Sequence, residues 1–320
     1  MPGIEEAAEK LSENTSKGSH LQERFDDIES IEKDAVVKES ELRKEIEITR
    51  PGKVAGVDGG LIKKRYSTGD LVAIRAVAAI LDFSEDKVES KYVPSKSPEP
   101  DYHVFEPEEA DSIDRNAESE RLKAETSVAI DSTEKCDMVL MDGSVVPSYL
   151  EDNKALENYT ELFKMAGAGK LIGVVEDSYG LKLGEILEEK LGFEISEMRD
   201  TLLMDMILEE GERSFVRRYA KGPVEHPVLG KLEEQDVNRI HTFYVKLSSQ
   251  DLPLRIDYFG DPEHADDIAS KLLYMKSSDR YTVPSPIVEA DRRAKLDQKY
   301  LKRLEKRFSP EVKRRDRRVL

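Results

Sequence analysis

The chain has 320 residues and a mass of 36.3 kDa, which leaves room for one large domain or two ordinary ones. Its single cysteine, Cys136, excludes an internal disulfide framework and a cysteine-based zinc cluster, and no apolar run is long enough to span a membrane. A net charge of −17 argues against a generic nucleic-acid-binding surface, because sequence-independent DNA affinity comes from neutralising phosphates. The first residues are polar and acidic, unlike a signal peptide, so we expect a soluble cytoplasmic protein.

The charge is unevenly distributed along the chain. Residues 292–320 contain 13 Lys or Arg and four Asp or Glu, so they carry a net +9 and residues 1–291 carry −26. Such asymmetry is typical of a chain that meets nucleic acid at one end, and equally of a solvated basic helix. Taken alone, the basic tail therefore leaves both interpretations open.

The predicted elements indicate an α/β fold. Residues 1–48 are rich in Glu, Lys and Ala, which predicts a helical arm interrupted at 16–19. After Arg50-Pro51-Gly52, apolar runs predict strands at 54–60, 71–81, 86–93 and 102–105, and the proline-rich residues 93–112 predict a loop. Helices are then expected at 114–133, 154–168, 180–191, 199–209, 262–275 and 287–307, and strands at 137–144, 170–177, 214–219, 240–247 and 253–259. This alternation predicts a mixed sheet, because the chain opens with hairpins.

Three of the predicted strands run into carboxylates: Asp58, Asp142 and the pair Glu176-Asp177. A carboxylate at the end of a strand lies on rigid scaffold at the sheet edge, where open α/β sheets place their sites. Neighbouring acids repel one another unless a cation lies between them, and oxygen-only ligands suit Mg²⁺ or Mn²⁺. Because Asp-Gly is also a common turn sequence, metal ligands and turns remain equal alternatives here.

The helix at 114–133 offers further acids, namely Glu118, Glu120 and Glu125. Most acids on a helix face solvent, and Glu125 is the best candidate for facing inward because Leu122 and Ala129 neighbour it at helical spacing. Other catalytic motifs fail: the Gly-rich run before Lys170 leads into a strand rather than a helix, and the five histidines lack ligand spacing.

In their order along the chain, these features resemble the NurA nucleases over roughly residues 50–300. The segments that carry the resemblance are Val54–Gly60, Arg121–Glu125, Val139–Ser144, Gly173–Ser178, Leu208–Arg213 and Val283–Leu296. No single segment is specific, but the ordered set is.

The resemblance implies an RNase H-like (PIWI-like) core with a mixed β-sheet flanked by helices, a helical N-terminal arm and a basic helical C-terminus. We therefore expect an arm at 1–49, a nuclease domain at 50–300 and a basic tail at 301–320. It also implies a ring-shaped homodimer that depends on Mn²⁺, or Mg²⁺, and acts as a 5′→3′ DNA exonuclease and single-strand endonuclease. The implied partners are single- and double-stranded DNA ends, the hexameric ATPase HerA and, functionally, the Mre11–Rad50 proteins of archaeal double-strand break repair.

Carried over by position, Asp58, Glu125 and Asp142 resemble the family's catalytic metal ligands, with Glu120 as the alternative helical acid. Asp291 stands where many relatives have a histidine, and a carboxylate there could bind a metal but would donate a proton less readily than imidazolium.

Two further expectations concern the substrate. Arg292, Arg293 and Lys295 are expected to contact nucleic acid, and Tyr281 either orients a phosphate or packs in the core. Two rival functions remain: an RNA-cutting hydrolase of the same fold, and a non-catalytic DNA clamp or adaptor for a translocating ATPase.

Overall fold

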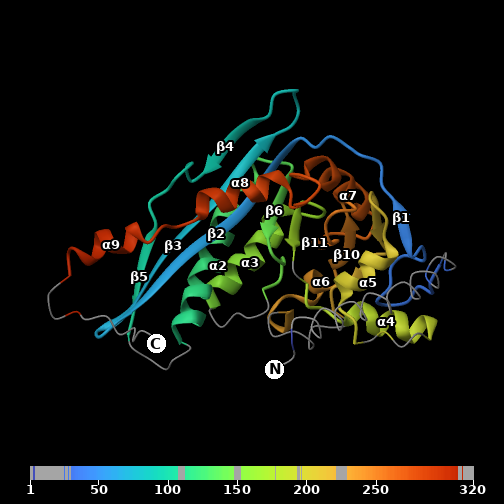
Figure 1. Ribbon diagram of the computed structural model, residues 1–320, viewed down its shortest axis with the longest axis horizontal. Helices are drawn as coiled ribbons and strands as arrows, with labels where there is room; N and C mark the ends of the chain where they lie inside the picture. The colour runs from blue at the N-terminus through green and yellow to red at the C-terminus, as the bar shows by residue number, and fades with distance from the viewer. Residues whose placement is uncertain are drawn as a thin grey trace.

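The computed structural model describes residues 30–106, 112–147, 153–176, 178–192, 197–220 and 229–308, together with residues 3, 25, 28, 195 and 312. In this part of the chain, eleven strands form one sheet in the order β1-β8-β10-β11-β7-β6-β2-β3-β4, while β5 pairs with β3 and β9 with β10 (Figure 1). The strands are β1 (Arg43–Glu45), β2 (Lys53–Tyr66), β3 (Gly69–Asp82), β4 (Glu89–Val93), β5 (Asp101–Phe105), β6 (Met138–Asp142), β7 (Leu171–Val175), β8 (Glu212–Ser214), β9 (Arg217–Arg218), β10 (Ile240–Lys246) and β11 (Leu254–Phe259).

The helices are α2 (Ser112–Thr133), α3 (Asn153–Ala166), α4 (Lys182–Leu191), α5 (Asp200–Ile207), α6 (Glu234–Val237), α7 (His264–Met275), α8 (Ser285–Ala294) and α9 (Lys299–Glu305), with a 3₁₀ turn η2 (Leu229–Lys231). Within the described residues, no helix is both long and apolar enough to cross a membrane. The predicted mixed α/β architecture is confirmed: β2, β6 and β7 run parallel, whereas β2 and β3 form a long antiparallel hairpin.

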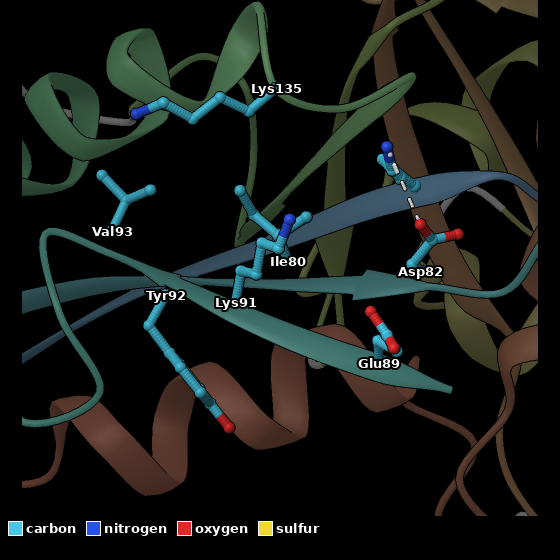
Figure 2. Close-up of a pocket in the computed structure, with 8 residues that line it drawn as sticks. Ile80, Asp82, Glu89, Lys91, Tyr92, Val93 and Lys135 are labelled. Carbon is cyan, nitrogen blue, oxygen red and sulfur yellow. Dashed lines mark ion pairs between the residues drawn. The ribbon is translucent and has the colours of Figure 1, made fainter. Parts of the chain in front are cut away.

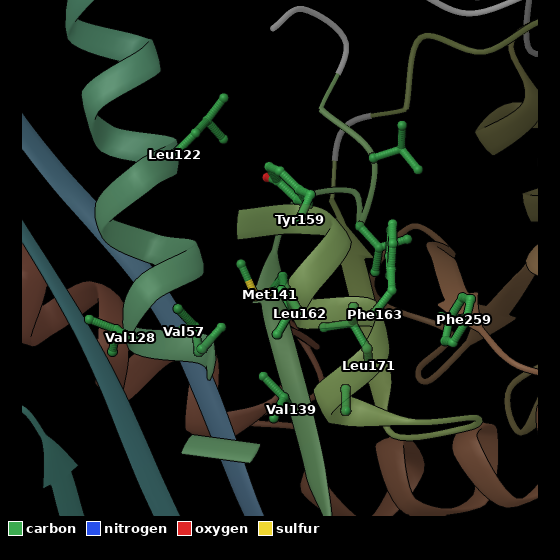
Figure 3. Packing of buried hydrophobic residues seen from close by; sticks show 14 of the residues in the cluster. Val57, Leu122, Val128, Val139, Met141, Tyr159, Leu162, Phe163, Leu171 and Phe259 are labelled. Carbon is green, nitrogen blue, oxygen red and sulfur yellow. The ribbon is translucent and has the colours of Figure 1, made fainter. Parts of the chain in front are cut away.

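Side chains of the central strands alternate between two apolar layers. Val139 and Met141 of β6 pack with α2 and α3 on one face, where Leu122 and Phe163 close the cluster (Figure 3). Leu140 and its alternate neighbours pack on the opposite face, against α7 and α8. This period of two decides on which side of the sheet each polar residue of a strand lies.

Helix α8 lies directly on the backbone of β2 and crosses the β2–β3 hairpin (Figure 1). A Cβ atom at Gly56 would lie 2.1 Å from the carbonyl carbon of Pro286, and one at Gly60 would lie 2.3 Å from the carbonyl oxygen of Ala294. Only glycine allows so close an approach. The two glycines, four residues apart, therefore let both ends of α8 lie in contact with the backbone of β2.

Two predictions about element boundaries are wrong. The strand expected at 54–60 continues to Tyr66, so Asp58 lies inside β2 rather than beyond its end. The helix expected at 287–307 is two helices, α8 and α9, with a break at 295–298.

The helical arm predicted for residues 1–48 is also wrong over residues 30–48, which are extended and include β1, paired with β8. The apolar residues Ile31, Val37 and Leu42 are buried against α4 and α5. Tertiary packing thus overrides a helix-like composition, which is only a weak preference. The break expected at 16–19, Asp177, and residues 313–320 of the basic tail lie outside the described residues.

Candidate active site

Asp58 and Asp142 lie together on the α8 face of the sheet. In the parallel register Val57 of β2 is opposite Met141 of β6, so the two aspartates follow at adjacent positions. Alternation sends both side chains to the same face, since Gly56 lies under α8 and Leu140 packs in the α7–α8 layer. Their carboxyl groups lie close enough to interact, because a hydrogen bond with Asp142 lowers the pKa of Asp58.

The environment of this pair disfavours two negative charges. Burial raises the pKa of Asp58, and the negative charge of Asp291 raises it further. A hydrogen bond from the backbone N–H of Gly59 lowers this pKa and so partly offsets the rise. Desolvation and the charges of Asp58 and Glu176 raise the pKa of Asp142 to about 7. Asp142 is nevertheless exposed, so solvent screens part of this effect. A cation between the carboxylates would relieve the repulsion.

Two more acids surround the pair. Asp291 extends the cluster from α8, and its charge acts on both Asp58 and Asp142. Glu176 directly follows β7 and accepts a hydrogen bond from the hydroxyl of Tyr281 at 3.0 Å. The Tyr281 ring is exposed, so it is not a packed core residue.

Glu125 approaches the same part of β2 from the opposite face, where α2 covers the sheet. A Cβ atom at Gly59 would lie 2.5 Å from the Glu125 Oε1 atom, so the missing side chain makes the space for this carboxyl group. Glu125 is almost fully buried, and its pKa is raised to about 8. Desolvation is the main cause; the positive charge of Arg121 lowers this pKa, and the negative charge of Asp58 raises it further. The helical acid is therefore held beside Asp58 at a position where its charge is costly.

Arg121 is the positive charge of the cluster. Its guanidinium forms an ion pair with Glu125, one turn further along α2, and its Nε atom donates to Glu118 at 3.0 Å. Although burial disfavours its charge, the negative charges of Glu125, Glu118 and Asp58 raise its pKa above the usual value. Arg121 thus balances part of the acidity that the carboxylates bring together.

As the side chains lie, the described residues contain no group of three His, Cys, Asp or Glu arranged to hold a metal ion. Asp58 and Asp142 lie on the α8 face of the sheet, whereas Glu125 lies on the α2 face and is paired with Arg121. The donor chemistry still fits a hard divalent cation, because the site consists of carboxylate oxygens that repel one another in its absence. To join Asp58 and Asp142 around such a cation, Glu125 would have to release Arg121.

The structure separates the two candidate glutamates of α2. Glu120 forms an ion pair with Lys123 at 2.8 Å, and its Oε2 atom lies 3.7 Å from the His103 Nδ1 atom, on a different side of the helix from Arg121 and Glu125. Glu125, and not Glu120, is the one placed against Gly59 beside Asp58. This geometry supports the assignment of Glu125 as the helical acid of the site.

The arrangement can now be compared with known proteins. A family model described as the NurA domain matches residues 52–296. The chain belongs to the NurA family. Its fold is similar to that of a NurA nuclease from Sulfolobus solfataricus, with 17% identity, a TM-score of 0.54, and coverage of 95% of this chain and 97% of the other. A structure of NurA bound to dAMP and manganese shares 12% identity, with a TM-score of 0.58 and coverage of 96% and 97%. A NurA structure with manganese shares 13% identity, with a TM-score of 0.52 and coverage of 83% and 92%. No curated protein sequence matches the chain.

The basic residues expected to contact nucleic acid in this NurA chain differ in availability. Arg293 forms an ion pair with Glu289 at 2.7 Å and lies over the Tyr92 ring. Arg292 is largely exposed, with only a 3.8 Å pairing to the same Glu289, and Lys295 is exposed just past the end of α8. Arg292 and Lys295 are thus the better placed of the three to meet a phosphate backbone.

Two residues beside the carboxylates, Arg121 and Gly59, were given no role of their own by the sequence, although both stand in segments that carry the family resemblance. The spacing of Arg121 and Glu125 by one helical turn was a usable signal, because such a pair meets on one helix face. The sequence predicts that Gly59 stands at the end of a strand. In the structure it lies inside β2, and its missing side chain leaves room for the Glu125 carboxyl group.

A pocket of about 330 Å³ lies away from the carboxylate cluster, where β3 and β4 meet the end of α2 (Figure 2). Lys53 pairs with Asp82 at 3.7 Å at its edge, and Lys91, Tyr92 and Lys135 also line it. It contains none of the carboxylates of the cluster, so we assign the chemistry to the cluster and not to this pocket.

Proposed function

We propose that this chain is a manganese-dependent deoxyribonuclease that hydrolyses phosphodiester bonds at the carboxylate cluster. The observation that carries the proposal is the contact of Asp58 with Asp142 on two parallel strands, with Asp291 and Glu125 beside them. Solved NurA structures that contain manganese, one of them with dAMP, support the choice of metal and substrate class.

In this mechanism Asp58 and Asp142 would hold the ion from rigid strands, and Glu125 is the third donor. When bound, Mn²⁺ would activate water for in-line attack and stabilise the leaving oxygen. The raised pKa values of Glu125 and Asp142 mean that both must release protons to become ligands, so metal binding is expected to strengthen as the pH rises. Asp291 would supply a further oxygen ligand rather than act as a general acid.

The finer parts of the proposal are supported by family membership. We infer an RNase H-like core, 5′→3′ exonuclease and single-strand endonuclease activity, and a homodimer that works with the HerA ATPase on DNA ends. The role would be end resection in double-strand break repair in an archaeal cytoplasm, alongside Mre11–Rad50. Arg292 and Lys295 would hold the DNA backbone during the reaction.

The test is cleavage of labelled single-stranded DNA and of matched RNA in Mn²⁺, comparing wild type with Glu125→Gln and Glu120→Gln. Both variants remove one carboxylate charge from α2, so Glu120→Gln is the matched control. We expect DNA cleavage by wild type and Glu120→Gln and a loss of about 10²-fold or more in Glu125→Gln, on the scale of losing one positioned catalytic group.

Preferential cleavage of RNA by the wild type would instead identify the RNA-cutting alternative. Unchanged cleavage in Glu125→Gln would remove Glu125 from the site. DNA binding by the wild type without metal-dependent cleavage in any condition would favour the clamp or adaptor.

A further inference from the structure

A second pocket, of about 90 Å³, opens beside the carboxylate cluster. It is lined by Glu176, Ser178, Tyr179, Arg199, Thr201, Leu202 and Leu252. Glu176 links this pocket to the carboxylate cluster, because it lines the pocket and its charge acts on Asp142. Its carboxylate also accepts a hydrogen bond from the hydroxyl of Tyr281. The pocket therefore adjoins the proposed site of hydrolysis through Glu176.

The rim of this pocket is unusually apolar for a surface. Among the described residues, eleven large hydrophobic side chains are exposed, and Tyr179, Leu202 and Leu252 of this pocket are three of them, with exposures of 71%, 45% and 44%. Tyr281, which is 45% exposed, lies near these side chains. The backbone N–H of Thr282, the next residue, donates to the carboxylate of Asp251, which directly precedes Leu252. Exposed apolar side chains gathered in one place indicate a surface that meets a ligand or partner.

The same rim carries a cation on an aromatic ring. The Arg199 guanidinium lies over the Tyr179 ring, 4.6 Å from its centroid. A tyrosine ring with an adjacent arginine is the combination on which unpaired nucleobases stack, because every base presents a π-face to a ring and to a guanidinium plane. Glu176, which also lines the pocket, repels phosphate, and this favours an uncharged base there.

The floor beneath the rim is rigid. Ser178 and Thr201 are buried, and the Thr201 hydroxyl donates to the Ser178 carbonyl at 2.9 Å. Arg255 also donates to the Ser178 hydroxyl, at 3.1 Å. Because Tyr179 follows Ser178 directly, this network fixes the backbone from which the exposed ring projects, and a fixed ring loses little freedom when a base stacks on it.

We propose that Tyr179, with Arg199, Leu202 and Leu252, forms a stacking platform for an unpaired nucleobase of single-stranded DNA whose backbone passes the carboxylate cluster. This inference rests on the proposed nuclease function and adds a substrate preference to it. Bases in a duplex are already paired and stacked, so the platform favours single strands and frayed ends over intact double strands.

The experiment measures the binding of short single-stranded DNA that carries one 2-aminopurine, in EDTA so that no cleavage occurs. Wild type is compared with Tyr179→Ala, Tyr179→Phe and the control Tyr102→Ala, which removes an exposed tyrosine of β5 outside the pocket. We expect Tyr179→Ala to weaken binding roughly 5- to 100-fold and to abolish the quenching of 2-aminopurine, because one base–ring stack is lost. Tyr179→Phe and Tyr102→Ala should bind as wild type does, and duplex binding should not change.

The outcomes separate this inference from the proposed function. If wild type cleaves DNA in Mn²⁺ but Tyr179→Ala binds single strands with unchanged affinity and quenching, the platform is refuted and the nuclease stands. If wild type neither binds nor cleaves DNA, both fail. If Tyr179→Ala leaves DNA binding intact and instead changes the oligomeric state in size-exclusion chromatography, the rim is a subunit contact and the inference is overturned.

Discussion

Gly59→Ala tests the position of Glu125 without touching a carboxylate. The added Cβ atom would lie 2.5 Å from Glu125 Oε1 and 2.8 Å from its Cγ atom, whereas ordinary contacts begin near 3.4 Å. The buried Glu125 side chain must therefore move by about 1 Å, and a misplacement of that size costs on the order of 10²-fold in rate. Overpacking destabilises by about 1–3 kcal/mol, and alanine regains about 0.5–1 kcal/mol over glycine within a strand.

The assay is the initial rate of single-stranded DNA cleavage at saturating Mn²⁺, with urea unfolding measured on the same preparations. We expect a large loss of rate with a loss of unfolding free energy of about 2 kcal/mol or less. Glu125→Asp in the Gly59→Ala background shortens the clashing side chain, so it should restore stability without restoring the full rate. A wild-type rate in Gly59→Ala would refute the placement of Glu125 at the reaction site.

Three further predictions follow from the same geometry. Arg121→Met removes the positive charge that pairs with Glu125 and competes with a metal ion for that carboxylate. Calorimetry near pH 8 should therefore show roughly tenfold tighter Mn²⁺ binding than in wild type. An unchanged affinity would mean that Arg121 does not share the site. Because the pKa of Glu125 is raised to about 8 in the folded state, the native protein binds more protons than the unfolded chain, and metal-free stability should fall as the pH rises from about 4.5 to 8. Urea unfolding across that range should show this slope in wild type and a smaller one in Glu125→Gln; equal slopes would contradict the assignment. Gly56→Ala would place a Cβ atom 2.1 Å from the Pro286 backbone, so α8 must shift and thermal unfolding should reveal a loss of about 3 kcal/mol; wild-type stability would show that α8 does not rest on this glycine.

The sequence predicts the central sheet well because its strands are long apolar runs with clear ends. The sequence shows Asp58 and Asp142 each after an apolar run, and the structure places them in adjacent register on parallel strands, with Asp58 inside β2. What the pattern could not predict is the length of β2. Residues 61–66 read Leu-Ile-Lys-Lys-Arg-Tyr, and two glycines before them and three consecutive basic residues among them do not show the alternation that predicts a continuing strand.

The sequence indicates that the glycines permit a close approach, but it could not predict which segments approach them. Gly56, Gly59 and Gly60 are needed for close approach by α8 and by Glu125, and a close approach depends on segments far along the chain. The same holds for residues 30–48, whose apolar side chains find partners on α4 and α5 rather than along a helix of their own. Local composition determines neither contact, since both are decided by tertiary packing.

The most direct test of the metal-dependent site is a calorimetric Mn²⁺ titration of Asp58→Asn beside wild type, with DNA cleavage followed on the same samples. The substitution keeps the shape of the side chain and removes one of the two carboxylates that meet on β2 and β6. We predict that Asp58→Asn remains folded, loses the strongest Mn²⁺ binding and loses cleavage with it. A folded Asp58→Asn that binds Mn²⁺ and cleaves DNA as wild type does would contradict the assignment of the reaction to this cluster.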